Sequence, residues 1–227
     1  MAELTITDHR RDSAGLTYVY PVISRRSGGL SIGVNLNPNN ACNWRCVYCQ
    51  VPDLSRGTAP EIDLDRLKEE LREFLRAARH EDFGERYRLT ESQRIIRDIA
   101  ISGNGEPTSC RQFDAVVETM GEVCAEFALL GAVKLVLITN GSLVGRPLVK
   151  RGLARWSELG GEIWFKVDSV TETGVQRINQ VRLTPLATSE VKGLPSSDSI
   201  LSSASKALAA CARARSRARE RPLWLPA

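Results

Sequence analysis

Apolar residues recur at three- and four-residue spacing in long segments of the chain, with charged residues between them. The clearest such segment is 63–79, which begins with Asp63. This spacing places the apolar side chains on one face of a helix, and Asp is favoured at a helix N-terminus. Cys124 lies on the apolar stripe of a second segment, so we expect its thiol to pack in the core. The pattern predicts helices over 63–79, 111–130, 146–159 and 171–180.

Short apolar runs alternate with these helical segments. Residues 17–36 contain two runs on either side of Gly28 and Gly29, which favours a β-hairpin with a tight turn. Further runs have the length of strands and are almost continuously apolar, as expected of parallel strands buried on both faces. These runs lie at 95–102, 134–139 and 162–169.

Strands that alternate with helices at this spacing predict βα units and therefore an α/β fold with a parallel sheet. In such folds the functional site lies at the carboxyl ends of the strands. Here each strand is followed by a loop that carries Gly, Asn, Asp, Glu or Cys. We expect four loops to converge at that edge, namely 37–50, 102–108, 139–142 and 166–170.

Composition and charge narrow the class of protein. Hydrophobic residues make up 42% of the chain and charged residues 26%, which is ordinary for a globular protein. The net charge is +4, and all of the excess lies in residues 187–227. We therefore expect no general nucleic-acid-binding surface on the rest of the chain. Because no apolar run reaches the roughly 18 residues of a membrane span and no signal peptide is evident, we expect a cytoplasmic protein without membrane contact.

Residues 186–227 differ in character from the rest, because Ser, Ala and Arg dominate them and no strand-like run occurs. We expect this segment to be a low-complexity, basic and disordered tail. The predicted organisation is then an N-terminal extension with the first hairpin strand (1–29), the α/β domain (30–185) and the tail (186–227).

Cys42, Cys46 and Cys49 carry the clearest chemical signal. Such a cluster, in a chain without a secretion signal, favours metal binding or redox chemistry over disulfides. Structural zinc usually takes four protein ligands, and neither His9 nor His80 lies in a ligand-like pair. A [4Fe–4S] cluster normally takes four thiolates, so three would leave one iron open to a small molecule. On the residues alone, zinc, an iron–sulfur cluster and incidental cysteines all stay open.

The CxxxCxxC spacing, directly after a strand in a βα protein, resembles the radical SAM superfamily. Tyr48, just before the third cysteine, matches the aromatic residue usual there, and the resemblance extends over about 30–180. It implies a partial (βα) barrel in which Cys42, Cys46 and Cys49 hold a [4Fe–4S] cluster. It also implies that the open iron binds S-adenosylmethionine, which one electron cleaves to methionine and a 5′-deoxyadenosyl radical that abstracts hydrogen from a substrate.

The resemblance further implies cofactor-binding residues at the strand ends. Residues 103–107 correspond to a GGEP-like element that holds the methionine amino group, although Asn stands where Gly is commonest. Residues 139–141 match a TNG element, and 166–169 lie where the family binds ribose or substrate. Without the resemblance, each of these is an ordinary strand-ending turn. The expected cofactor-binding residues are Gly103, Asn104, Gly105, Glu106, Pro107, Asn140, Asp168 and Ser169, with a weaker case for Asn179.

The function implied is that of a radical SAM enzyme of unknown substrate, with a one-electron reductant such as flavodoxin or ferredoxin as partner. Residues 20–52 look like bacterial proteins related to the tRNA wyosine-synthase group, which makes modified tRNA a candidate substrate. The alternatives are a non-catalytic iron–sulfur or zinc-binding module and an inactive member of the superfamily. A complete superfamily barrel has six βα units, and we count four strands before residue 186. We therefore expect a truncated or frame-shifted chain.

Overall fold

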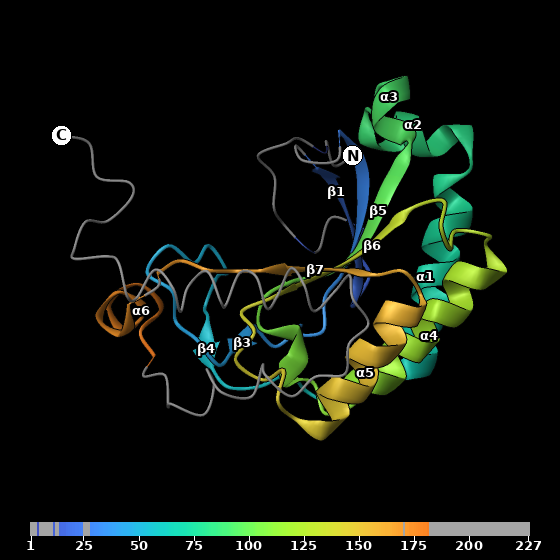
Figure 1. The fold of residues 1–227 in the computed structure, drawn as a ribbon. Helices are drawn as coiled ribbons and strands as arrows, with labels where there is room; N and C mark the ends of the chain where they lie inside the picture. Colours follow the sequence, from blue (N-terminus) through green and yellow to red (C-terminus); the bar gives the residue numbers. More distant parts are fainter. Residues whose placement is uncertain (1–3, 5–10, 12–13, 25–27, 170, 182–227) are drawn as a thin grey trace.

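The computed structural model describes residues 4, 11, 14–24, 28–169 and 171–181 (Figure 1). Its main sheet has five strands in the order β1-β2-β5-β6-β7. They are β1 (Val19–Ser24), β2 (Gly29–Val34), β5 (Ile96–Ile101), β6 (Lys134–Thr139) and β7 (Glu162–Phe165). A second, two-stranded sheet contains β3 (Ala41–Cys42) and β4 (Ser55–Arg56).

Most of the helices lie between these strands in the chain, and the last one follows β7. They are α1 (Leu64–Ala78), α2 (Glu81–Tyr87), α3 (Glu91–Arg94), the 3-10 turn η1 (Pro107–Ser109), α4 (Phe113–Glu126), α5 (Pro147–Glu158) and α6 (Glu172–Asn179). Figure 1 shows α1, α4 and α5 side by side along one side of the sheet, while α6 lies near β3 and β4. None of the described helices has the length and apolar character that crossing a bilayer demands.

The strand directions confirm the predicted fold class. β1 pairs with β2 in antiparallel fashion, with Val19 opposite Val34, so the segment 17–36 is the expected hairpin. The strands β2, β5, β6 and β7 are all parallel. The fold is therefore α/β, a mostly parallel sheet of the partial-barrel kind preceded by an N-terminal hairpin.

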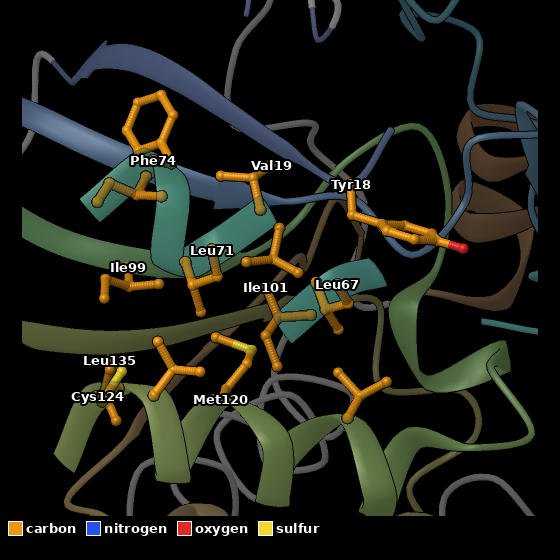
Figure 2. Close-up of a cluster of buried hydrophobic side chains, with 14 of the residues drawn as sticks. Tyr18, Val19, Leu67, Leu71, Phe74, Ile99, Ile101, Met120, Cys124 and Leu135 are labelled. Carbon is orange, nitrogen blue, oxygen red and sulfur yellow. The ribbon is translucent and has the colours of Figure 1, made fainter. Parts of the chain in front are cut away.

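Alternate residues of each strand point to opposite faces of the sheet. One face packs its apolar side chains against α1 and α4, and this layer is the hydrophobic core (Figure 2). Cys124 is fully buried in that layer, which confirms the prediction for its thiol. The figure labels members of the core from both layers: Val19, Ile99, Ile101 and Leu135 from the strands, and Leu67, Leu71, Phe74, Met120 and Cys124 from the helices.

The ends of the elements follow from local chemistry. Asp63 is the N-cap of α1, as predicted, because its carboxylate accepts a hydrogen bond from the Arg66 backbone N–H at 3.0 Å. α4 is shorter than the predicted 111–130, because Ala128 adopts a left-handed φ of 54° and turns the chain. β7 is shorter than the predicted 162–169, because Phe165 is the last residue paired with β6. The expected tail, 186–227, lies outside the described residues.

Candidate functional site

A cavity of about 530 Å³ lies against the sheet face opposite the helices and extends over the carboxyl ends of the strands. Residues from all four predicted loops line it. Of the expected site residues, those that line the cavity are Cys42, Cys46, Cys49, Gly103, Asn104, Gly105, Glu106 and Asn140. The parallel topology produces this convergence, because it brings the carboxyl end of every parallel strand to one edge.

Asparagine side chains shape the loop that carries the cysteines. The Asn35 Oδ1 atom accepts hydrogen bonds from the backbone N–H groups of Asn37 and Asn104, at 3.0 and 3.1 Å. The Asn37 side chain donates to the carbonyl of Ala41 at 2.8 Å. Short asparagine side chains that bond nearby backbone groups stabilise turns in this way. The loop after β2 is thereby held against the loop after β5.

The three cysteines differ in exposure, since Cys42 and Cys46 are half-buried and Cys49 is exposed; all three have free thiols. Burial raises the pKa of the Cys42 thiol, and the Trp44 backbone N–H, 3.5 Å from Sγ, opposes that rise. The Asn179 side-chain amide donates to the Cys46 Sγ atom at 3.2 Å. Two of the three sulfurs therefore have an N–H donor, which is a common environment for iron–sulfur ligands.

The described residues contain no group of three or more His, Cys, Asp or Glu side chains arranged to hold a single metal ion. The described histidine, His80, lies at the N-cap of α2. A structural zinc site needs its ligands to converge on one point, usually four of them. Thiolates that bind a [4Fe–4S] cluster each bind a different iron, so they can lie further apart around one cavity. All three thiols line one cavity, and their expected role as ligands of a [4Fe–4S] cluster stays a prediction.

Glycine is required at two positions of the loop after β5. A Cβ atom added to Gly105 would lie 2.1 Å from the Ala41 carbonyl oxygen, and one added to Gly103 would lie 2.2 Å from the Asn35 Oδ1 atom. Both contacts are shorter than any real Cβ contact, so only glycine lets this loop approach the cysteine loop so closely. Asn104, between them, donates from its side chain to the Asn40 Oδ1 atom at 2.7 Å.

Glu106 is buried and hydrogen-bonded within the protein. Its carboxylate accepts from the Asn140 backbone N–H at 2.7 Å, from the Thr108 backbone N–H at 3.1 Å, and from the hydroxyls of Thr108 and Thr139. Burial raises the pKa of Glu106, and the hydrogen-bond donors oppose that rise. Its carboxylate connects the loops after β5 and β6, and its expected role toward an ammonium group stays a prediction.

Asn140 connects the loop after β6 to the cysteine loop. Its side-chain amide donates to the Asn43 Oδ1 atom at 3.0 Å, and its own Oδ1 atom accepts from the Ser142 hydroxyl at 2.7 Å. The Asn43 side chain in turn donates to the Ser142 hydroxyl at 2.7 Å. These three polar side chains form a closed network beside the cysteines.

Three of the expected cofactor-binding residues lie outside the lining of the cavity. Pro107 is buried as the first residue of η1. The Asp168 carboxylate accepts from the Tyr48 hydroxyl and from the Asn179 amide, and Ser169 bonds the Thr171 backbone N–H at the start of α6. None of these three residues is among those that line the cavity. Burial is the main reason why the pKa of the Tyr48 phenol is raised, and the hydrogen bond to Asp168 raises it further.

The sequence reasoning missed polar residues of the sheet face that forms the cavity wall. Ser31 of β2 donates to the Asp98 carboxylate of β5, and the Tyr20 and Ser102 hydroxyls are 2.9 Å apart. The indole of Trp164 lines the same wall. The available signal was a polar residue at alternate positions within strands that otherwise looked continuously apolar.

No family model matches the chain. The chain is 30% identical to a UPF0026 protein of Methanocaldococcus jannaschii, over 70% of this chain and 43% of that protein. It is 26% identical to a UPF0026 protein of Synechocystis sp., over 71% and 52%. It is also 26% identical to a GTPase Obg of Brachyspira hyodysenteriae, over 59% and 17%. The chain thus spans about half or less of these relatives.

Among solved structures, the chain is similar to TYW1 with a lysine–pyruvate adduct bound. The TM-score is 0.39 with 13% sequence identity, over 69% of this chain and 47% of that one.

Proposed function

We propose that the chain is a radical SAM enzyme that binds a [4Fe–4S] cluster through Cys42, Cys46 and Cys49 and S-adenosylmethionine beside it. One observation carries the proposal: the three thiols share a single cavity with the glycine-rich loop after β5 and with Asn140. An α/β fold with its site at the carboxyl ends of parallel strands supports the same conclusion.

The donor set suits iron–sulfur chemistry. All three candidate ligands are thiols, and soft sulfur ligands favour iron–sulfur clusters over hard cations. Three thiolates leave one iron of a [4Fe–4S] cluster without a protein ligand, as cofactor binding requires. When bound, the cluster and S-adenosylmethionine together supply one-electron cleavage of the sulfonium, and the protein supplies position and shelter.

The residues around the thiols have roles that follow from their contacts. Gly103 and Gly105 let the loop after β5 pack closely against Asn35 and Ala41, which keeps this loop beside the thiols at the cavity. Glu106 orients the backbone of Asn140 through a 2.7 Å hydrogen bond. Trp44 is only 7% exposed and shields the Cys42 side of the cavity from water.

The remaining wall of the cavity is where a substrate would lie. The polar groups there are the hydroxyls of Tyr20, Ser31 and Ser102 and the carboxylate of Asp98. These groups favour a substrate with hydrogen-bonding groups of its own. Cys49 is exposed at the surface, which gives an electron donor such as flavodoxin or ferredoxin access to that side of the site.

Anaerobic reconstitution with iron and sulfide tests the proposal. We expect about four irons and four sulfides per chain, an EPR signal on reduction that S-adenosylmethionine perturbs, and release of 5′-deoxyadenosine and methionine. Cys42→Ala, Cys46→Ala and Cys49→Ala should each abolish the brown chromophore. Cys124→Ala is the control, because this thiol is buried in the core, and it should leave the chromophore intact. One zinc per chain, or a chromophore that depends equally on Cys124, would overturn the proposal.

A further inference from the structure

The C-terminal end of α6 is bonded to the cysteine loop at two points and to β4 at a third. The backbone N–H of Arg45 donates to the Asn179 carbonyl at 3.1 Å, and that of Val47 donates to the Ile178 carbonyl at 2.8 Å. The Arg56 guanidinium donates to the Gln180 carbonyl at 2.8 Å. These carbonyls are among the last of a helix, which have no partner within it. The cysteine loop satisfies two of them, on either side of Cys46 in sequence, so the position of Cys46 depends on α6.

The side chain of Asn179 extends this contact to the sulfur itself. Asn179 is 1% exposed, and its Nδ2 atom donates to the Cys46 Sγ atom at 3.2 Å and to the Asp168 Oδ2 atom at 2.6 Å. Its Oδ1 atom is buried and has no hydrogen-bond partner within the described part of the chain. Rotating the amide would place that oxygen against a carboxylate and a sulfur, both acceptors. The two acceptors therefore determine the orientation of the amide.

Asp168 is itself held in place by Tyr48. Its carboxylate accepts from the Tyr48 hydroxyl, and the Lys166 ammonium lies 4.4 Å from the centre of the Tyr48 ring. The chain of contacts runs from Tyr48 through Asp168 and Asn179 back to Cys46, two residues from Tyr48. Leaving one buried amide oxygen unpaired has a free-energy cost. The compensating contact is the N–H donated to a thiol that we assign as a cluster ligand.

We propose that Asn179 is a positioning residue that holds the Cys46 sulfur in the cavity and raises the reduction potential of the cluster bound there. The inference rests on the proposed function. An N–H donor withdraws negative charge from a ligating sulfur, and the reduced cluster carries one more negative charge than the oxidised one. The hydrogen bond therefore stabilises the reduced form more than the oxidised form. Asp168 acts through Asn179, which explains why it contacts the amide and does not line the cavity.

The test compares cluster midpoint potentials by EPR-monitored redox titration of the reconstituted protein. Asn179→Ala removes the donor and should shift the potential to more negative values. Val175→Ala is the matched control, because Val175 is buried on the same helix at 6% exposure and should leave the potential at the wild-type value. A potential in Asn179→Ala equal to that of Val175→Ala overturns the inference.

An exchange variant, Asp168→Asn combined with Asn179→Asp, separates a structural role from an electronic one. It keeps the charge and an amide–carboxylate hydrogen bond between the two positions, but it places a carboxylate against the Cys46 sulfur. We expect a potential more negative than that of Asn179→Ala. If the pair were merely structural, the exchange would preserve the wild-type potential, which overturns the inference even where Asn179→Ala fails to fold. A wild-type chain that takes up no iron and sulfide overturns the proposed function, and this inference with it.

Discussion

The Glu106 carboxylate accepts a hydrogen bond of 2.7 Å from the backbone N–H of Asn140, across 34 residues of sequence. Glu106 follows β5 and Asn140 follows β6, which are adjacent parallel strands. Thr108 and Thr139 donate to the same carboxylate, so one buried side chain satisfies polar groups of both loops. The loops around the cavity are therefore held together by the protein's own side chains.

Replacing Glu106 should destabilise the protein. Glu106→Ala leaves the N–H groups of Asn140 and Thr108 and the Thr139 hydroxyl buried without an acceptor. Each such group costs about 1–3 kcal/mol, so we expect a loss of roughly 3 kcal/mol or more in the free energy of unfolding. Glu106→Gln retains one acceptor oxygen and should lose less. Urea denaturation gives the three midpoints, and equal midpoints for wild type and Glu106→Ala would show that the network contributes nothing.

Glu70 makes a similar connection beside the first strand. It is 5% exposed, and its carboxylate accepts from the backbone N–H groups of Thr17 and Tyr18 at 2.9 and 2.7 Å. It thereby attaches the start of β1 to α1. Glu70→Ala should cost about 2–4 kcal/mol by leaving buried N–H groups unpaired. Glu69→Ala is the control, since Glu69 is exposed and pairs with Arg72 on the surface. Thermal unfolding followed by circular dichroism should show a large decrease in melting temperature for Glu70→Ala and almost no decrease for Glu69→Ala.

The thiols should differ sharply in reactivity. Burial raises the pKa of Cys124 to about 12, whereas Cys49 is exposed. The thiolate is the nucleophile, so Cys124 at pH 8 has only about one part in ten thousand in the reactive form. We expect iodoacetamide to alkylate Cys49 in the native cluster-free protein and to leave Cys124 unmodified until the pH approaches its raised pKa or the chain unfolds. Peptide mass spectrometry after timed labelling measures both sites, and comparable rates at pH 8 would refute the burial of Cys124.

The alternation of strands and helices was predictable because apolar residues are almost continuous in buried parallel strands but recur every three or four residues in amphipathic helices. The run 134–139 coincides with β6. The two-residue strands β3 and β4 were not predictable, since two residues are too few to show a repeating pattern of apolar and polar positions. Asn40, just before β3, has a left-handed φ of 53°, and its side chain donates to the Pro52 carbonyl at 3.0 Å, which helps to bring β4 back beside β3. Such a contact depends on where the loop returns, and no local pattern of apolar residues records it.

The convergence of the four loops was predictable because each loop follows a strand of the parallel set, as the loop with Gly105 follows β5. The contacts of a side chain that turns toward a distant segment were not predictable. Asp168 accepts a hydrogen bond from Tyr48, 120 residues away in sequence, and its expected contact with a cofactor stays a prediction. Ser31 and Asp98 were missed because the strands that contain them were read as continuous apolar runs. Their hydrogen bond across adjacent strands exists only once β2 and β5 are paired in register.

Gly105 and Gly57 both lie against Ala41, and substitutions at these two positions test the geometry of the loop. A Cβ on Gly105 would lie 2.1 Å from the Ala41 carbonyl oxygen, whereas a Cβ on Gly57 would lie 3.3 Å from the Ala41 Cβ atom. The first contact is with backbone that already accepts a 2.8 Å hydrogen bond from Asn37. The second is with a methyl group, which can move by a few tenths of an ångström. The two substitutions should therefore differ although they approach the same residue.

We expect Gly105→Ala to force the loop after β5 away from Ala41 and, with it, from Cys42. Overpacking of this kind costs about 1–3 kcal/mol, and the reconstituted protein should bind less iron and sulfide because the first thiol is displaced. Gly57→Ala should keep both its stability and its iron content near the wild-type values. Melting temperature and iron content, measured on the same preparations, show whether Gly105→Ala and Gly57→Ala differ in this way. If both variants lose stability and iron equally, the close approach of Gly105 to the cysteine loop is not what positions Cys42.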